Sequence, residues 1–252
     1  MNLKKQRIQN WPLILVFLLL PSLLYAFSFE PISAVFSPSG REATKSFLLK
    51  NETDEFTALR ISLFERSVDI NGKETRIPAD HLFLVYPSRI VLPPESVQTL
   101  RVKWQGDSTV SAERAFRILV EQVPVEFENQ ESRTSGLQIM FRYLGSIYIT
   151  PKDAFFRLEV ENTKILRTPE GAAKLEFTVA NTGTRHVILE DLRLEIGYDS
   201  QNGRKILELF PEELKGIAEE NILAGARRRF LLELPPGVTG DSADVQIRHN
   251  SN

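Results

Sequence analysis

The chain has 252 residues, 42% of them hydrophobic and 25% charged, proportions that are normal for a folded protein of one large or two ordinary domains. Its formal net charge of −2 argues against nucleic-acid binding, since that function needs a basic face. It contains no cysteine, which excludes disulfides, thiolate nucleophiles and zinc–thiolate sites.

The first 26 residues have the pattern of a secretory signal peptide. Three basic residues precede an apolar run from Trp11 to Leu24 that is short for a membrane span. We place cleavage after Ala26, a small residue, and the alternative is an uncleaved anchor. Removing residues 1–26 takes away three positive charges, so the formal net charge moves from −2 to −5. The sequence therefore predicts an exported, mildly acidic protein.

From Phe27 onward, short runs of alternating apolar and polar residues are separated by Gly, Pro, Asn and Asp, without a sustained period of 3.6. This pattern predicts an all-β protein, and its regular spacing suits a β-sandwich. The helix-like segment Pro211–Glu220 is short and acidic, and we interpret it as a loop with a turn or two. The clearest predicted strands are Lys45–Leu49, Thr57–Phe64, Arg89–Leu92, Thr99–Trp104, Ala115–Glu121, Leu137–Ile149, Phe155–Val160, Ala173–Ala180, His186–Ile196 and Arg229–Leu234.

An apolar strand that ends in asparagine occurs twice, as Phe47–Asn51 and Phe177–Asn181. Each copy lies near the start of a stretch of about 100 residues, the size of an immunoglobulin-like domain. Pro151 follows a long predicted strand and would end it. The sequence therefore predicts two immunoglobulin-like β-sandwich domains, residues 27–150 and 151–252, joined by a short hinge.

The long strand predicted at residues 137–149 carries an apolar side chain at every second position. Such side chains share one face of a strand and must be buried against something. The residues alone favour a row that faces the core of its own domain. The four members, here called the apolar row, are Leu137, Ile139, Phe141 and Tyr143.

Three segments resemble periplasmic pilus (fimbrial) assembly chaperones of the PapD-like family, in a divergent branch. They are Val85–Val102, with its prolines and Gln98-Thr99-Leu100-Arg101 strand, then Glu113–Pro124, then Leu137–Pro151. The resemblance covers residues 27–151 well. In the remainder, only the general arrangement of strands and turns resembles the family. It implies a periplasmic protein that binds pilus subunits and delivers them to an outer-membrane usher.

The resemblance also changes the interpretation of the apolar row. It implies that the row lies at an exposed sheet edge and inserts into the groove of a subunit whose own fold lacks its last strand. This mode of strand addition is donor-strand complementation. An apolar edge strand invites pairing with any other open edge, so two copies of the chain could also associate through it.

The family's subunit-anchoring residues are replaced in this chain. Better-known members hold the subunit's terminal carboxylate with an arginine on the first strand and a lysine near the end of the donor strand. The alignment puts Ser33 and Ser146 at those two positions, and serine cannot form an ion pair. Either a divergent branch anchors the subunit through other residues, for instance Arg142, Arg117 or Arg89, or the chain is no longer a chaperone.

We find no motif of an enzyme. The three histidines, His81, His186 and His249, are isolated in the sequence, and none has metal or triad spacing. The G-x-S-x-G, P-loop and dinucleotide motifs are absent. We therefore expect no catalysis, no cofactor and no small-molecule substrate. The rival interpretation is a secreted structural or adhesive protein with two immunoglobulin-like domains that never donates a strand.

Overall fold

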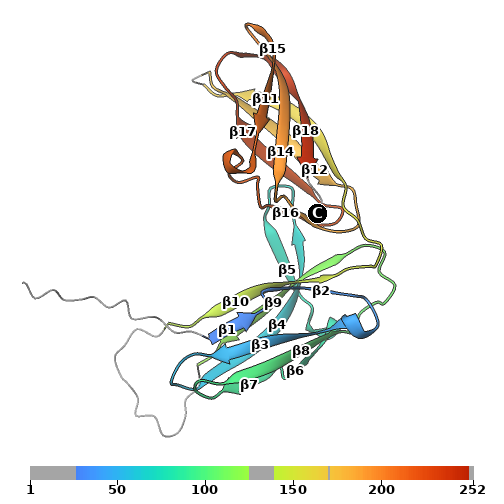
Figure 1. Ribbon diagram of the computed structural model, residues 1–252, viewed down its shortest axis with the longest axis vertical. Helices are drawn as coiled ribbons and strands as arrows, with labels where there is room; N and C mark the ends of the chain where they lie inside the picture. The colour runs from blue at the N-terminus through green and yellow to red at the C-terminus, as the bar shows by residue number, and fades with distance from the viewer. Residues whose placement is uncertain (1–26, 125–138, 170, 250–252) are drawn as a thin grey trace, which may run out of the picture.

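The computed structural model describes residues 27–124, 139–169 and 171–249, so the predicted signal peptide lies outside the described residues. Two immunoglobulin-like β-sandwiches, joined by a short hinge, form a bent molecule (Figure 1). The all-β prediction is thus confirmed. None of the helical turns within these ranges has the length and apolar character of a membrane span.

The first domain packs one sheet of order β1-β3-β8-β6 against a second of order β2-β10-β9-β4-β5, in which β7 also pairs with β4. Two short 3-10 turns connect strands, η1 (Arg41–Ala43) and η2 (Asp80–Leu82). The strands are β1 (Phe27–Glu30), β2 (Ser33–Phe36), β3 (Thr44–Asn51), β4 (Thr57–Val68), β5 (Glu74–Pro78), β6 (Phe83–Tyr86), β7 (Arg89–Leu92), β8 (Val97–Trp104), β9 (Arg114–Gln122) and β10 (Arg142–Ile149).

Strict alternation of side chains builds the core of this domain. On β8, Leu100, Val102 and Trp104 are buried while the residues between them are exposed, which is the two-residue period of a half-buried strand. Phe83 joins the two sheets, because its ring packs edge-on against Trp104 and Phe116 at centroid distances of 5.2 and 5.0 Å.

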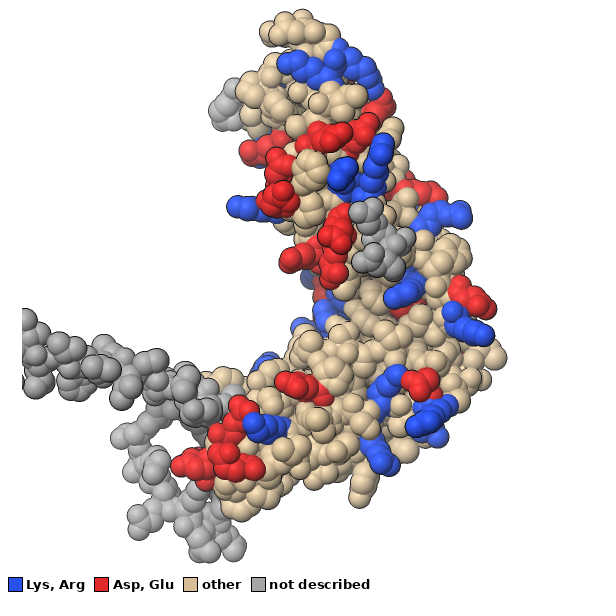
Figure 2. Space-filling view, in the orientation of Figure 1, with Lys and Arg blue, Asp and Glu red and all other residues tan. Residues whose placement is uncertain are grey.

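The second domain has its own core, formed by three sheets of order β11-β12-β17, β13-β16 and β15-β14-β18. In the view of Figure 2, charged side chains gather over this domain, whereas much of the first domain's surface is uncharged. The elements are β11 (Leu158–Arg167), β12 (Ala173–Asn181), β13 (Val187–Ile188), β14 (Leu192–Ser200), β15 (Gly203–Leu209), η3 (Pro211–Glu213), β16 (Asn221–Ile222), β17 (Arg227–Glu233) and β18 (Val238–His249).

Two strand predictions in this domain are wrong in detail. Residues 186–196 form two strands, β13 and β14, because Asp191 between them has a φ of 52°, which is incompatible with extended backbone. The strand predicted from Phe155 begins only at Leu158. The Phe155 carbonyl instead accepts hydrogen bonds from the backbone N–H groups of Thr184 and Arg185, at 2.7 and 2.8 Å.

The repeated asparagine has the same role in both domains. Asn51 and Asn181 are buried at the end of β3 and β12, and each side-chain amide donates to the carbonyl four residues later and to two carbonyls 41 and 42 residues later. The internal echo in the sequence therefore marks equivalent positions of the two sandwiches. The acceptors are Glu55, Leu92 and Pro93 for Asn51, and Arg185, Ile222 and Leu223 for Asn181, at 2.7–3.3 Å.

Replacing Asn181 by alanine should lower the free energy of unfolding by about 1–3 kcal/mol, because three backbone carbonyls would lose their donor. Urea unfolding measures the effect. Asn202→Ala, in an exposed turn, is the matched control and should change the free energy by less than about 0.5 kcal/mol. Equal effects of the two substitutions would show that the buried amide is not structural.

Candidate functional site

The strand predicted at residues 137–149 begins only at Arg142, as β10, so Ile139 and Phe141 precede it. Strand β10 is paired along its full length on one side only. It pairs with β9 from Arg142 to Ile149, but with β2 only from Ser146 to Ile149. The residues Arg142–Gly145, here called the free edge, therefore have no strand partner on the β2 side within the described residues. The Ser146 N–H donates to Ile32 on that side, so by two-residue alternation the backbone groups of Arg142 and Leu144 point to the open side as well.

The apolar row is divided between the domain's own core and its surface. Phe141 and Tyr143 are half-buried against the core of the first domain. The Tyr143 hydroxyl donates to the Phe27 carbonyl at 2.7 Å, and the two rings meet edge-on at 4.9 Å. Ile139 is 44% exposed. Leu137 lies outside the described residues.

The two serines at the family's anchoring positions face each other. Ser33 on β2 is the register partner of Ser146 on β10. The guanidinium of Arg117 on β9 donates to the Ser146 hydroxyl at 2.6 Å. The same guanidinium donates to both carboxylate oxygens of Glu74, at 2.7 to 3.2 Å. An arginine therefore lies beside the serine pair, although it comes from a different strand.

Two further arginines from the β4–β5 hairpin complete this group, which we call the arginine cluster: Arg66, Arg76 and Arg117 around Glu74. Arg66 Nε lies 2.7 Å from the Glu74 carboxylate without an aligned hydrogen bond, and Arg76 Nε lies at 3.5 Å. Burial alone would raise the pKa of Glu74, but the hydrogen bond from Arg117 and the three positive charges hold the pKa below its ordinary value. Three cations around one anion leave a net charge of +2.

Arg142 and Arg89, the other two candidate anchors, lie apart from this cluster. Arg142 is the register partner of Glu121, and Arg89 is the partner of Arg60. Glu121 on β9 and Arg60 on β4 are register partners of each other, and Glu121 is four residues from Arg117 along β9. At about 3.3 Å per residue, both candidates are about 13 Å from the arginine cluster along the strands.

A buried glutamate joins the two domains at the hinge. Glu113 accepts from the backbone N–H of His186 at 3.0 Å, lies 2.6 Å from His186 Nδ1, and accepts from the Thr150 hydroxyl at 2.7 Å. The His186 ring stacks on Tyr148 at a centroid distance of 3.8 Å. Burial alone would raise the pKa of Glu113, but the hydrogen bonds and charge of His186 and the bond from Thr150 hold it below its ordinary value of 4.5.

The β4–β5 hairpin reaches from the first domain to the second (Figure 1). Its Ile70 carbonyl accepts from the Arg229 N–H of β17 at 2.8 Å. A small apolar cluster of Ala115, Tyr148 and Leu223 also spans the junction. The hinge is therefore held by backbone, polar and apolar contacts together.

No sequence pattern predicted Glu74, Arg66 and Glu113 as site residues. Glu74 meets Arg117 43 residues away, and Glu113 meets His186 73 residues away, so no local pattern links these pairs. The Asn71-Gly72 turn was the one available signal, because it indicates the hairpin that carries Arg66 and Glu74.

Comparison with known proteins identifies relatives of this arrangement. Residues 34–154 match the family model described as pili and flagellar-assembly chaperone, PapD N-terminal domain. This match confirms the family resemblance seen in the sequence. A comparison with curated proteins gives no match.

Several solved structures share the fold. The class 5 fimbriae chaperone CfaA has 14% identity and a TM-score of 0.55, over 90% of this chain and 100% of its own. The CsuC–CsuE chaperone–tip subunit complex of Acinetobacter baumannii has 14% identity and a TM-score of 0.57, over 88% and 97%. The Salmonella enterica SafA pilin–SafB chaperone complex has 14% identity and a TM-score of 0.50, over 88% and 97%. At this identity the likeness establishes the two-domain fold.

Glu113→Gln should make the domain junction less stable at neutral pH. Because the folded-state pKa of Glu113 is depressed, its stabilising contribution is present above about pH 4.5 and is lost as the pH falls further. The substitution should therefore lower the free energy of unfolding by about 1–3 kcal/mol at pH 7 and have a smaller effect at pH 3.5. Thermal unfolding of both proteins between pH 3.5 and 7 measures this, and a constant difference would contradict it.

Proposed function

We propose that this chain is a periplasmic chaperone that stabilises pilus subunits by donor-strand complementation and delivers them to an outer-membrane usher. The match of residues 34–154 to the pili and flagellar-assembly chaperone family, PapD N-terminal domain, supports this proposal. The free edge of β10 carries this proposal. Its outward backbone groups would form a ladder with a strand of the subunit. The proposal includes export through the predicted signal peptide, residues 1–26.

The apolar row would supply the side-chain contacts. Ile139 is the most exposed of the described members of the row, and its burial in a subunit groove would contribute about 2 kcal/mol. Phe141 and Tyr143 would support the strand from the core side while offering their half-exposed surfaces. Since backbone pairing sets the grip and alternate side chains set the register, a subunit with a complementary row of pockets is the partner that fits.

The arginine cluster would anchor the subunit's terminal carboxylate. Arg117 is already bonded to Ser146, next to the free edge, and its guanidinium has the fork geometry that binds carboxylates. Glu74 occupies this place in the free protein, and the net charge of +2 would let a second carboxylate enter beside it. The divergent branch would thus take its anchoring cation from β9, because serines occupy the usual anchoring positions on β2 and β10.

The rival function is a secreted structural or adhesive protein of the same fold. Such a protein would not need a free edge with the exposed Ile139 beside it. An open apolar edge promotes aggregation, so this arrangement would be a disadvantage without a partner strand. The two functions differ in a measurable way, because only the chaperone should form a soluble one-to-one complex with a pilus subunit.

Ile139→Asp should weaken subunit binding by about 30-fold, because a carboxylate would have to enter an apolar groove and about 2 kcal/mol of burial would be lost. Co-purification of the subunit from periplasmic extracts measures this. Ile139 is 44% exposed, so the unfolding temperature should not change.

Met140→Asp is the matched control. Met140 is adjacent and 52% exposed, but it does not belong to the apolar row, so the complex should survive. If Ile139→Asp retains the subunit as well as Met140→Asp does, strand donation through the apolar row is wrong.

Arg117→Ala should weaken subunit binding by about 10- to 100-fold, because a charge-assisted hydrogen bond contributes about 1.5–3 kcal/mol. Arg60→Ala on the same sheet, whose side chain pairs with Glu121, should leave the affinity unchanged. Titration of a purified subunit by calorimetry compares the two variants. Equal affinities would exclude Arg117 as the anchor and leave strand donation itself intact.

A further inference from the structure

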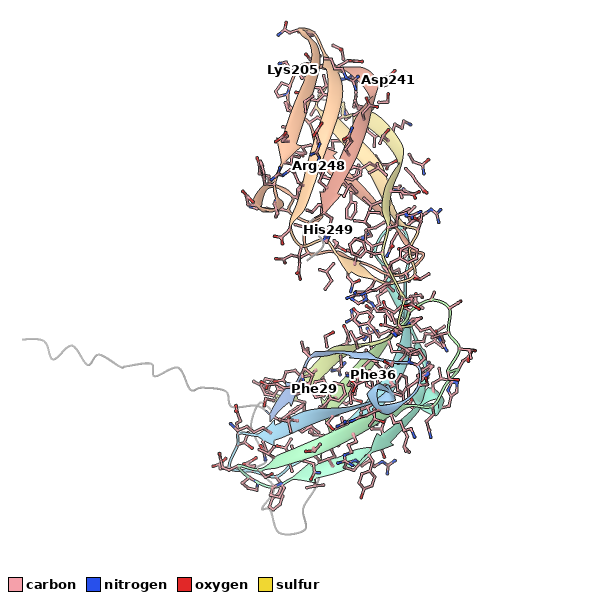
Figure 3. All side chains as sticks on the ribbon, turned by 45° about the vertical axis from the view of Figure 1, so that its right-hand side comes forward. Phe29, Phe36, Lys205, Asp241, Arg248 and His249 are labelled. Carbon is pink, nitrogen blue, oxygen red and sulfur yellow. The ribbon has the colours of Figure 1, made fainter. Side chains whose placement is uncertain are left out.

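A hollow of about 480 Å³ lies on the second domain, away from β10 and the arginine cluster. It is bounded by the ends of β14 and β18 and by the turn that follows β15. In Figure 3, Arg248 lies on the second domain, and His249 beyond it lies toward the first domain. The lining residues are Asp191, Leu192, Arg193, Phe210, Pro211 and Arg248.

Two arginines project side by side into this hollow. Arg193 on β14 and Arg248 on β18 are direct register partners in an antiparallel pair, so their side chains leave the same face of the sheet. Like charges opposite each other destabilise a sheet. Glu195 compensates only Arg248, by an ion pair of 3.3 Å. Within the described residues, Arg193 has no carboxylate partner.

An aromatic ring forms the apolar side of the hollow. The guanidinium carbon of Arg193 lies 4.8 Å from the centroid of the Phe210 ring, a cation–π contact that orients both groups. Phe210 remains 37% exposed. Its backbone N–H donates to the Glu213 carboxylate at 3.1 Å, and Pro211 fixes the backbone that follows. The ring is therefore held in place, with part of its surface exposed.

The sign and number of charges select the ligand. Because Glu195 already pairs with Arg248, the two guanidinium groups leave one positive charge, on Arg193, for a carboxylate or a phosphate. Asp191 lies at the rim, and no ion pair within the described residues joins its carboxylate to either arginine. A second negative charge would meet this carboxylate, which disfavours a phosphate dianion. Phe210 and Leu192 favour a ligand with an apolar group beside a single negative charge.

We propose that this hollow binds an acidic side chain of a partner peptide segment, with the carboxylate held by Arg193 and Arg248 and a neighbouring apolar side chain packed on Phe210. The site is a second contact surface, independent of the strand donation and of the carboxylate anchor proposed above. Its volume matches a small ligand pocket and accommodates one or two side chains.

Titration of the full mature chain with two acetylated, amidated dipeptides, Phe-Glu and Phe-Gln, tests the site. Calorimetry or chemical shifts of the arginine side chains measure binding, and we expect saturable millimolar affinity for Phe-Glu and about tenfold weaker binding of Phe-Gln. Inorganic phosphate at the same concentrations distinguishes a peptide site from a general anion site, and should bind more weakly than Phe-Glu.

Arg193→Gln and Arg248→Gln should each weaken Phe-Glu binding by about tenfold, and Phe210→Ala should remove the advantage of the aromatic residue in the probe. Arg204→Gln is the matched control on the same sheet, because Arg204 is exposed and pairs with Asp244, and it should bind Phe-Glu as the wild type does. Each arginine is exposed, so folding should be preserved. The proposal is overturned if Phe-Glu does not saturate, if phosphate binds equally well, or if the control loses binding equally.

Discussion

The parallel pairing of β2 with β10 covers only four residues, and the arrangement of the first domain depends on this limit. The strand before β2 is β1, which pairs with β3 of the opposite sheet. The chain therefore does not cover the free edge of β10, Arg142–Gly145. A chain that stayed in one sheet would have closed this margin. The crossing from sheet to sheet therefore provides both a packed sandwich and an unsatisfied edge, which is the element that a strand-adding partner requires.

The junction between the domains determines which residues lie near the free edge. The β4–β5 hairpin brings Arg66 and Glu74 beside Arg117 and then contacts β17 of the second domain. The contacts of Glu113 across the hinge are buried and charge-assisted, so they are stronger than exposed ion pairs. Because these contacts tie the domains together, we expect the free edge and the arginine cluster to keep a constant position relative to the second domain.

The two-residue period predicted the all-β fold, because half-buried strands impose it directly on the sequence. The repeated asparagine was a weaker signal, yet Asn51 and Asn181 have matching hydrogen bonds in the two sandwiches. The sites were harder to predict, since Glu74 and Glu113 meet partners 43 and 73 residues away. The residues alone favoured an apolar row that faces its own core, whereas the family resemblance favoured an exposed edge. The structure divides the row, with Phe141 and Tyr143 against the core and Ile139 exposed, because a period of two gives a face without saying which surface it meets.

The partial burial of the apolar row resolves a conflict between solubility and binding. A fully exposed row would promote aggregation, whereas a fully buried one would leave nothing for a partner. Here Phe141 and Tyr143 are half-covered by the domain's own core, and the exposed Arg142 places a charge at the open margin, which discourages pairing with another copy. Because β9 already holds Arg142–Gly145 in extended form, a partner strand, if it adds here as proposed, would not have to order this segment, and more of the contact energy would remain as affinity. The free edge is thus protected from pairing with another copy and is already in the extended form that strand pairing needs.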